Sequence, residues 1–193
     1  MKEQLPSDFH PALDAAAENA VLRAALADAQ RRLRDFEEQA ETDSLTGLAD
    51  ARRFARALDR VAGVAGRHGT TAAVLAIELQ GLEALEAAHG AMARDAALVH
   101  VARTLTSLIR TTDLLARTGA CEFGLILDHL DHDSAIDTAE RLQRCIAATP
   151  LDLGHASVRI EAVAAATALL AGDTAPDVLA RSARNLEFAK SER

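Results

Sequence analysis

The side chains best suited to acid–base or metal chemistry gather in the run from Asp128 to Asp133, which contains only aspartate, histidine and one leucine. Carboxylate and imidazole groups bind divalent metals. This run, however, falls between a predicted strand and a predicted helix, where a solvated loop is the simpler interpretation. The two cysteines, Cys121 and Cys145, lack the CxxC spacing of zinc and redox motifs. The chain also has no Walker loop and no GxSxG or HExxH pattern, so these residue types indicate no metal site and no catalytic group.

Composition excludes several classes of protein. The 193 residues fit one domain, or one domain with an appendage, and their 49% hydrophobic and 26% charged content is ordinary for a globular protein. A formal charge of -8, with no Trp and no Tyr, disfavours a nucleic-acid partner, which needs a positive field or stacking rings. The chain lacks an apolar run of membrane-spanning length and a signal peptide, so we expect a cytoplasmic protein without membrane insertion.

The N-terminal part is predicted to be one long helix. Residues 12–41 are almost all helix formers, and their apolar side chains recur at heptad spacing at Leu22, Leu26, Ala29, Leu33, Phe36 and Ala40. About 30 residues at 1.5 Å each would extend ~45 Å, too far for the rest of the chain to cover. We therefore expect residues 1–41 to form a dimerising coiled coil of undetermined orientation. An amphipathic helix packed on its own domain is the alternative.

The second predicted domain, residues 42–193, alternates helices and strands. Apolar periodicity predicts helices over residues 50–68, 82–88, 93–109, 134–148 (capped by Asp133) and 176–190, and strands over residues 73–79, 114–117, 122–127 and 158–167. A tight turn containing Gly119 joins the second and third strands. The expected fold class is therefore α/β, an α+β sandwich with a central, mostly antiparallel sheet flanked by helices.

Four segments of this domain resemble a known family. Residues 43–54, DSLTGLADARRF, resemble the DxLTGLxNRRxF opening of GGDEF domains, and residues 117–123, RTGACEF, resemble their RxGG(D/E)EF turn. Residues 139–142, AERL, and the segment 179–190 are similar to two helices of that family. The resemblance covers residues 43–193 and implies a nucleotidyl-cyclase-like fold. GGDEF domains condense two GTP molecules into cyclic di-GMP, so the resemblance also implies a role in signal transduction.

Three residues depart from the metal and turn positions that the resemblance implies. Ala120 replaces the second glycine of the turn, and Cys121 replaces the acidic residue that binds catalytic Mg²⁺. A neutral thiol is a poor ligand for this hard cation, which prefers oxygen. The other metal carboxylate aligns with Glu78, whose longer side chain would displace the ion. We therefore expect neither Mg²⁺ nor another cofactor, and no catalytic residue.

The positions that would contact GTP also differ from the family pattern. Glu83 and Glu86 stand where the family has a lysine and the asparagine that recognises guanine, which adds negative charge where a triphosphate should lie. Lys190 matches the family's phosphate-binding lysine. Phosphoryl transfer depends on positioning and on metal-assisted charge stabilisation. We therefore expect a degenerate GGDEF domain that is not an enzyme.

A second nucleotide site implied by the resemblance remains in place. Many family members bind the product cyclic di-GMP at an RxxD motif before the signature turn, and here that motif is Arg110-Thr-Thr-Asp113. Arg141 occupies the place of an additional arginine. A guanidinium can pair with guanine O6 and N7 or with a phosphate, and a carboxylate can accept from the guanine N1–H. The alternative is structural, because Arg suits a helix C-terminus and Asp suits a turn.

The leading hypothesis is therefore a catalytically inactive GGDEF signalling protein that binds cyclic di-GMP through Arg110, Asp113 and Arg141. It would form a homodimer through the N-terminal helix and regulate a protein partner whose identity stays open. The rival hypothesis is a nucleotide-independent protein-interaction scaffold, used in localisation or assembly. Residual GTP binding as a regulatory input is a third option, which Glu83 and Glu86 disfavour.

Overall fold

The computed structural model describes residues 19–30, 32, 41–68 and 70–192. The chain divides into two units, residues 1–40 and Glu41–Arg193. In the first unit the described residues 19–30 and 32 are helical, and Leu22 and Leu26 of the predicted heptad are exposed. Glu41, the last residue of the predicted helix, lies in a turn and not in a helix. The rest of the predicted coiled coil lies outside the described residues, and pairing with a second copy stays a prediction. No helix in the described part of the chain is long and apolar enough to cross a membrane.

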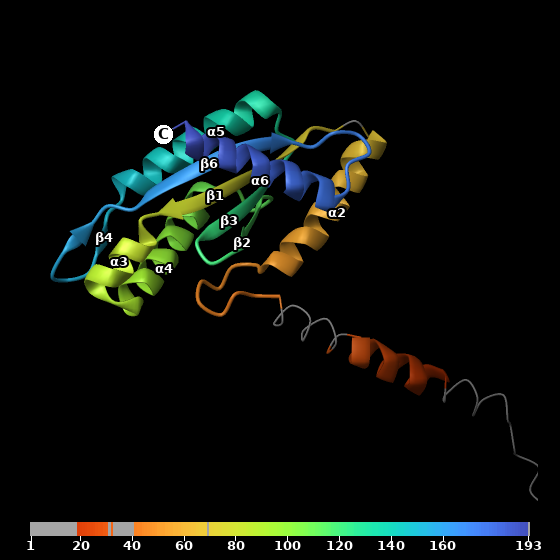
Figure 1. The fold of residues 1–193 in the computed structure, drawn as a ribbon. Coiled ribbons are helices and arrows are strands. Elements are labelled where there is room, and N and C mark those ends of the chain that lie inside the picture. Colours follow the sequence, from red (N-terminus) through yellow and green to blue (C-terminus); the bar gives the residue numbers. More distant parts are fainter. Residues whose placement is uncertain (1–18, 31, 33–40, 69, 193) are drawn as a thin grey trace, which may run out of the picture. The chain divides into compact units, whose positions relative to one another are not determined.

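The second unit is built on a four-stranded antiparallel sheet in the order β2-β3-β1-β6 (Figure 1). Its elements are α2 (Ala51–His68), β1 (Ala72–Gln80), α3 (Leu82–His89), α4 (Ala91–Leu108), β2 (Leu114–Arg117), β3 (Glu122–Asp128), α5 (His132–Ala148), β4 (Leu151–Asp152), β5 (Ser157–Val158), β6 (Glu161–Ala168) and α6 (Ala175–Ser191). Strands β4 and β5 form a separate two-stranded sheet. The structure confirms the predicted fold class, a mixed α/β fold with a central antiparallel sheet flanked by helices.

Strand β1 lies inside the sheet and packs against helices on both faces. Leu75 and Ile77 belong to the main core, which includes side chains of α3, α4 and α5. Val74 faces the other way and packs with Phe54 of α2 and Val178 of α6. Figure 1 shows α6 crossing β1 and β6 on that face. Because both faces are covered, β1 is almost continuously apolar, as its sequence indicated.

Helices α4 and α5 both begin two residues before their predicted starts, and two further predictions were wrong. Asp131, not Asp133, caps α5, since its side chain accepts a hydrogen bond from the Ser134 amide at 2.8 Å and the helix begins at His132. The predicted strand over residues 158–167 is two strands that pair with different partners. Strand β5 pairs with β4, whereas β6 pairs with β1, so the chain leaves one ladder before it joins the other. The short strand β4 was not predicted.

Candidate functional site

The loop at residues 43–48 is closed by the side chain of Asp43. Its Oδ1 accepts hydrogen bonds from the Thr46 amide at 2.8 Å and from the Thr46 hydroxyl at 2.6 Å. Gly47 follows with φ of 72°, a left-handed conformation that favours glycine. Burial would raise the pKa of Asp43, but the hydrogen bonds from Thr46 and the charge of Arg117 together lower it. The Asp43 carboxylate is therefore held in its charged form.

Arg117 connects this loop to the β2–β3 turn. Its Nη1 lies 3.1 Å from Asp43 Oδ2, and its Nη2 donates to the Ala120 carbonyl at 3.0 Å. Its backbone amide donates to the Ala49 carbonyl at 2.9 Å. Both side chains of the ion pair are mostly buried, at 16% exposed for Arg117 and 20% for Asp43. Two segments that carry the family resemblance thus hold each other in place.

Backbone amides of the β2–β3 turn donate hydrogen bonds within the turn itself. The Thr118 and Gly119 amides both donate to the Glu122 carbonyl, at 3.0 Å and 3.3 Å. A Cβ at Gly119 would lie 2.9 Å from Glu122 Oε2, so a larger residue there would require the Glu122 side chain to move. These two amides are therefore engaged inside the turn and are not directed toward a phosphate.

Glu78, aligned with a metal carboxylate of the family, is paired with a lysine. Lys190 Nζ lies 3.0 Å from Glu78 Oε2 and 2.9 Å from Glu187 Oε1. The other Glu78 oxygen, Oε1, accepts from Gln80 Nε2 at 3.1 Å. Hydrogen bonds to Glu187 and Glu78 raise the pKa of the Lys190 ammonium, which keeps it charged. The residue matched to phosphate binding and the residue matched to metal binding thus neutralise each other.

Cys121 stands half-buried at the position of the second metal ligand. Burial raises the pKa of its thiol, and the charges of Glu78 and Glu122 raise it further. The thiol form therefore dominates at neutral pH, and a thiol is a weak ligand for a hard cation.

The two glutamates at the positions matched to GTP contacts lie on α3. Glu83 is exposed in the first turn of the helix. Glu86 Oε2 lies 3.6 Å from Arg94 Nε of α4, so its charge is partly balanced within the fold. Neither side chain resembles the cationic or amide group that the family presents at these positions.

The structure brings Arg110, Asp113 and Arg141 to one small cavity of about 80 Å³. Arg110 and Asp113 lie between the end of α4 and the start of β2, whereas Arg141 lies on α5. The remaining lining residues are Leu108, Ile109, Leu127, Asp128, Leu130 and Thr138. We call this the arginine cavity.

In the arginine cavity the backbone groups of Arg110 and Asp113 are hydrogen-bonded, whereas the guanidinium groups of the arginines form no ion pair with the described residues. The Arg110 amide donates to Asp113 Oδ2 at 3.0 Å, and the Asp113 amide donates to the Arg110 carbonyl at 3.1 Å, so Asp113 closes a turn. Both arginine side chains are exposed, and neither guanidinium forms an ion pair with any residue that the structure describes. The two positive charges are therefore available to an anion.

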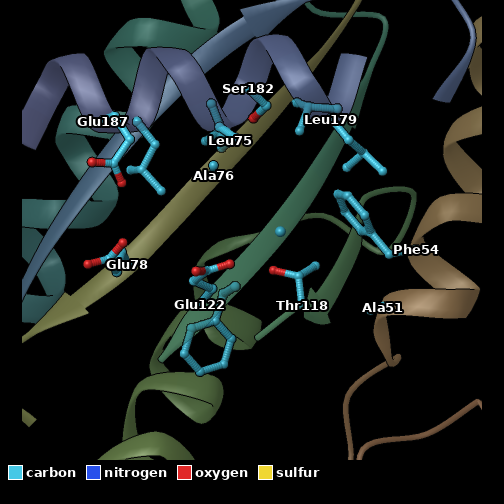
Figure 2. Close-up of a pocket in the computed structure, with 15 residues that line it drawn as sticks. Ala51, Phe54, Leu75, Ala76, Glu78, Thr118, Glu122, Leu179, Ser182 and Glu187 are labelled. Atoms are coloured by element: carbon cyan, nitrogen blue, oxygen red, sulfur yellow. The ribbon is translucent and has the colours of Figure 1, made fainter. Parts of the chain in front are cut away.

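A larger cavity, of about 290 Å³, was not predicted from the sequence. It lies between α2, α6 and the sheet, and Figure 2 shows side chains from all three around it. Small residues at Ala76, Gly124 and Ala183 line it. A Cβ at Gly124 would lie 2.6 Å from Phe54 Cζ, so glycine at this position makes room for the Phe54 ring. The small size of the three residues was visible in the sequence, but only the fold shows that they face one another. We call this the α2–α6 cavity.

Comparisons with known proteins identify relatives of this chain. The family model described as "Diguanylate cyclase, GGDEF domain" matches residues 40–193. The bifunctional diguanylate cyclase/cyclic di-GMP phosphodiesterase MucR of Pseudomonas aeruginosa is 32% identical over 146 residues, which is 76% of this chain and 21% of MucR. The chain spans 10%, 21% and 24% of the lengths of three curated relatives that it matches.

Two solved structures share the fold. The diguanylate cyclase SiaD, in complex with its activator SiaC from Pseudomonas aeruginosa, has a TM-score of 0.78 at 24% identity, covering 95% of this chain and 71% of that chain. The coiled coil and GGDEF domain of DgcB from Caulobacter crescentus, in complex with c-di-GMP, has a TM-score of 0.78 at 20% identity, covering 92% and 95%. Together with the family match over residues 40–193, these findings establish that the chain belongs to the GGDEF family.

Proposed function

We propose that this GGDEF protein is catalytically inactive and binds cyclic di-GMP at the arginine cavity, where binding regulates a protein partner. The observation that carries the proposal is the convergence of Arg110, Asp113 and Arg141 on one cavity, with both guanidinium groups free of ion pairs among the described residues.

The chemistry of the arginine cavity suits one part of a cyclic dinucleotide. A guanidinium forms two parallel hydrogen bonds with guanine O6 and N7 or with phosphate oxygens, and a carboxylate accepts from the guanine N1–H. At about 80 Å³ the cavity is smaller than the ~300 Å³ at which drug-sized pockets begin. It would therefore hold a base edge or one phosphate, and the rest of the ligand would lie on the surface near the two exposed arginines.

Catalytic inactivity is proposed from the residues around Glu78, at the positions matched to metal and phosphate binding. Lys190 is bonded to Glu78 and Glu187, and Cys121 presents a thiol where the family has a carboxylate. A metal ion at Glu78 would have to displace both Lys190 and Gln80. We therefore propose that neither GTP turnover nor an Mg²⁺ cofactor belongs to this chain.

Two proteins with the same fold were solved with a ligand or a protein partner, which supports proposing both for this chain. DgcB was solved in complex with c-di-GMP, and SiaD in complex with its activator SiaC. For this chain we propose a homodimer through the N-terminal helix, whose arrangement cyclic di-GMP shifts by a coupling free energy of ~1–3 kcal/mol.

One observation favours a second candidate function, a nucleotide-independent interaction scaffold. Asp113 already accepts the Arg110 amide, so a turn that needs this bond explains the aspartate without any ligand. In that case partner binding would not respond to cyclic di-GMP.

Calorimetric titration of the full chain with cyclic di-GMP tests the proposal. We expect micromolar or tighter binding, weakened at least ~30-fold in Arg110→Ala and Arg141→Ala, since arginine truncation at a binding hot spot costs about 2 kcal/mol or more. Matched controls are Arg103→Ala on α4 and Arg144→Ala on α5, which do not line the arginine cavity. Absence of binding would support the scaffold, and unchanged affinity in Arg110→Ala would overturn the site.

A further inference from the structure

The α2–α6 cavity shares no lining residue with the arginine cavity and belongs to no function proposed above. We propose that it binds a small molecule with an apolar body and a protonated amine. Three features of its lining carry this proposal: its walls, one unpaired hydroxyl group and the charge at one end.

The walls of the cavity are largely apolar. Phe54 comes from α2, Val74 from β1, and Leu179 and Leu186 from α6. Ligand pockets typically combine such walls with a few polar groups that fix orientation, and a volume of about 290 Å³ lies at the small end of their range of ~300–1,000 Å³. The cavity therefore suits a compact apolar body, such as a single ring with a short chain.

Ser182 supplies an unpaired polar group in this wall. Its side chain is 3% exposed, and its hydroxyl has no hydrogen-bond partner among the residues that the structure describes. Buried hydroxyl groups are nearly always paired, so such an exception calls for an explanation. Figure 2 shows Ser182 among the side chains that extend from α6 over the cavity. A polar group of a bound molecule would give this hydroxyl the partner that the protein does not.

One end of the cavity is negatively charged. Glu78, Glu122 and Glu187 all line it, and Lys190 pairs with Glu78 and Glu187. Glu122 has no ion pair in the described part of the chain, and Figure 2 shows its carboxylate directed from β3 toward α6. Three carboxylates against one ammonium leave a net negative end. This end favours a cationic group and disfavours an anionic one.

The negative end of the cavity adjoins the site at which the family resemblance would place the metal and the triphosphate, since Glu78 and Glu122 line it and Lys190 pairs with Glu78. Its apolar body extends away from that site. Of the segment 78–98 that aligns with the family's GTP-contacting pattern, only Glu78 lines the cavity. The apolar body of the cavity lies between α2 and α6, where Thr118 and Gly124 of the β2–β3 hairpin also line it. The three carboxylates at the negative end of the cavity would also repel a triphosphate.

The test uses two probes that differ only in the charged group, 2-phenylethylammonium and phenylacetate. Each is titrated into the ¹⁵N-labelled full chain while backbone amide shifts are recorded. We expect saturating shifts in α6 and β3 with the ammonium probe, at a dissociation constant of about 1 mM for so small a molecule. We expect at least tenfold weaker binding of phenylacetate. Glu122→Gln should reduce this preference to threefold or less.

Two alanine substitutions on α6 form a matched pair. Ala183→Leu fills the cavity and should weaken the ammonium probe at least tenfold, whereas Ala180→Leu, exposed on the same helix but outside the lining, should leave binding unchanged. Ser182→Ala should weaken binding severalfold without lowering the melting temperature, because the native hydroxyl has no partner to lose. Equal binding of both probes, or equal effects of Ala183→Leu and Ala180→Leu, would overturn the proposal.

Discussion

The charges around Glu78 and those around Arg110 differ in how they are satisfied. Lys190 is bonded to two carboxylates, and both Glu78 oxygens have donors. Arg110 and Arg141 are exposed and form no ion pair with the described residues. A paired cation must leave its partner before it binds a phosphate, whereas an unpaired one loses only water. Among these charges, the positive groups that are free to bind an anion therefore lie at the arginine cavity and not near the β2–β3 turn.

The largest expected effect is the absence of GTP turnover. We expect incubation of the full chain with GTP and Mg²⁺ to produce no cyclic di-GMP by chromatography. The expectation rests on Cys121, a thiol in place of one metal carboxylate, and on Glu78, which is already bonded to Lys190, since metal-assisted charge stabilisation is worth several kcal/mol. The diguanylate cyclase SiaD together with its activator SiaC serves as the positive control. Formation of cyclic di-GMP that is lost in Glu78→Gln would contradict this expectation. It would mean that Glu78 binds a metal although it is paired with Lys190.

The next largest effect concerns Arg117, a paired arginine that contrasts with Arg110. Asp43→Ala removes the hydrogen bonds from Thr46 and leaves the mostly buried Arg117 without its carboxylate partner. We expect the free energy of unfolding to fall by ~2–4 kcal/mol in urea denaturation. Asp95→Ala, on the exposed surface of α4, is the control and should stay within ~0.5 kcal/mol of the parent. Equal stability of the two variants would mean that this ion pair is not structural.

A smaller effect separates the two roles of Asp113. Asp113→Asn keeps an oxygen for the Arg110 amide but removes the negative charge. We expect cyclic di-GMP affinity to fall about tenfold, or about 1.4 kcal/mol, with the melting temperature unchanged. Calorimetry and a thermal melt on the same sample measure both quantities. A lower melting temperature with unchanged affinity would instead assign Asp113 to the turn alone.

The smallest effect is on the pH dependence of stability. Hydrogen bonds from Arg181 lower the pKa of Asp173 below its ordinary value of 3.8, and the pKa of Asp43 is lowered as well. The unfolded chain then binds more protons, so the stabilisation is complete above about pH 4 and declines as pH falls through the folded pKa values. Urea midpoints between about pH 5 and 3 should show this decline. The slope should be shallower in Asp43→Asn, and an identical slope would exclude Asp43 as a contributor.

Much of the secondary structure could be predicted because it depends on local patterns. The apolar run of β1 and the turn at Gly119 indicated their strands, and heptad and helical spacing indicated the helices. The cap of α5 was misplaced by two residues although it is local, because Asp131 and Asp133 are both suitable capping residues. The other error involves a pairing with a distant strand. The strand predicted over residues 158–167 divides because β5 pairs with the neighbouring β4, whereas β6 pairs with the distant β1. The second pairing is not encoded locally.

The family, the sheet-and-helix composition and the identity of Arg110, Asp113 and Arg141 as candidates followed from the sequence by itself, because motifs and periodicity are local properties. Only the tertiary structure decided which charges meet. Lys190 and Glu78 lie 112 positions apart along the chain, and their pairing depends on how α6 packs against β1. The same packing leaves Ser182 unpaired beside the α2–α6 cavity. Contacts between distant residues are set by how whole elements fit together, and single motifs do not determine that fit.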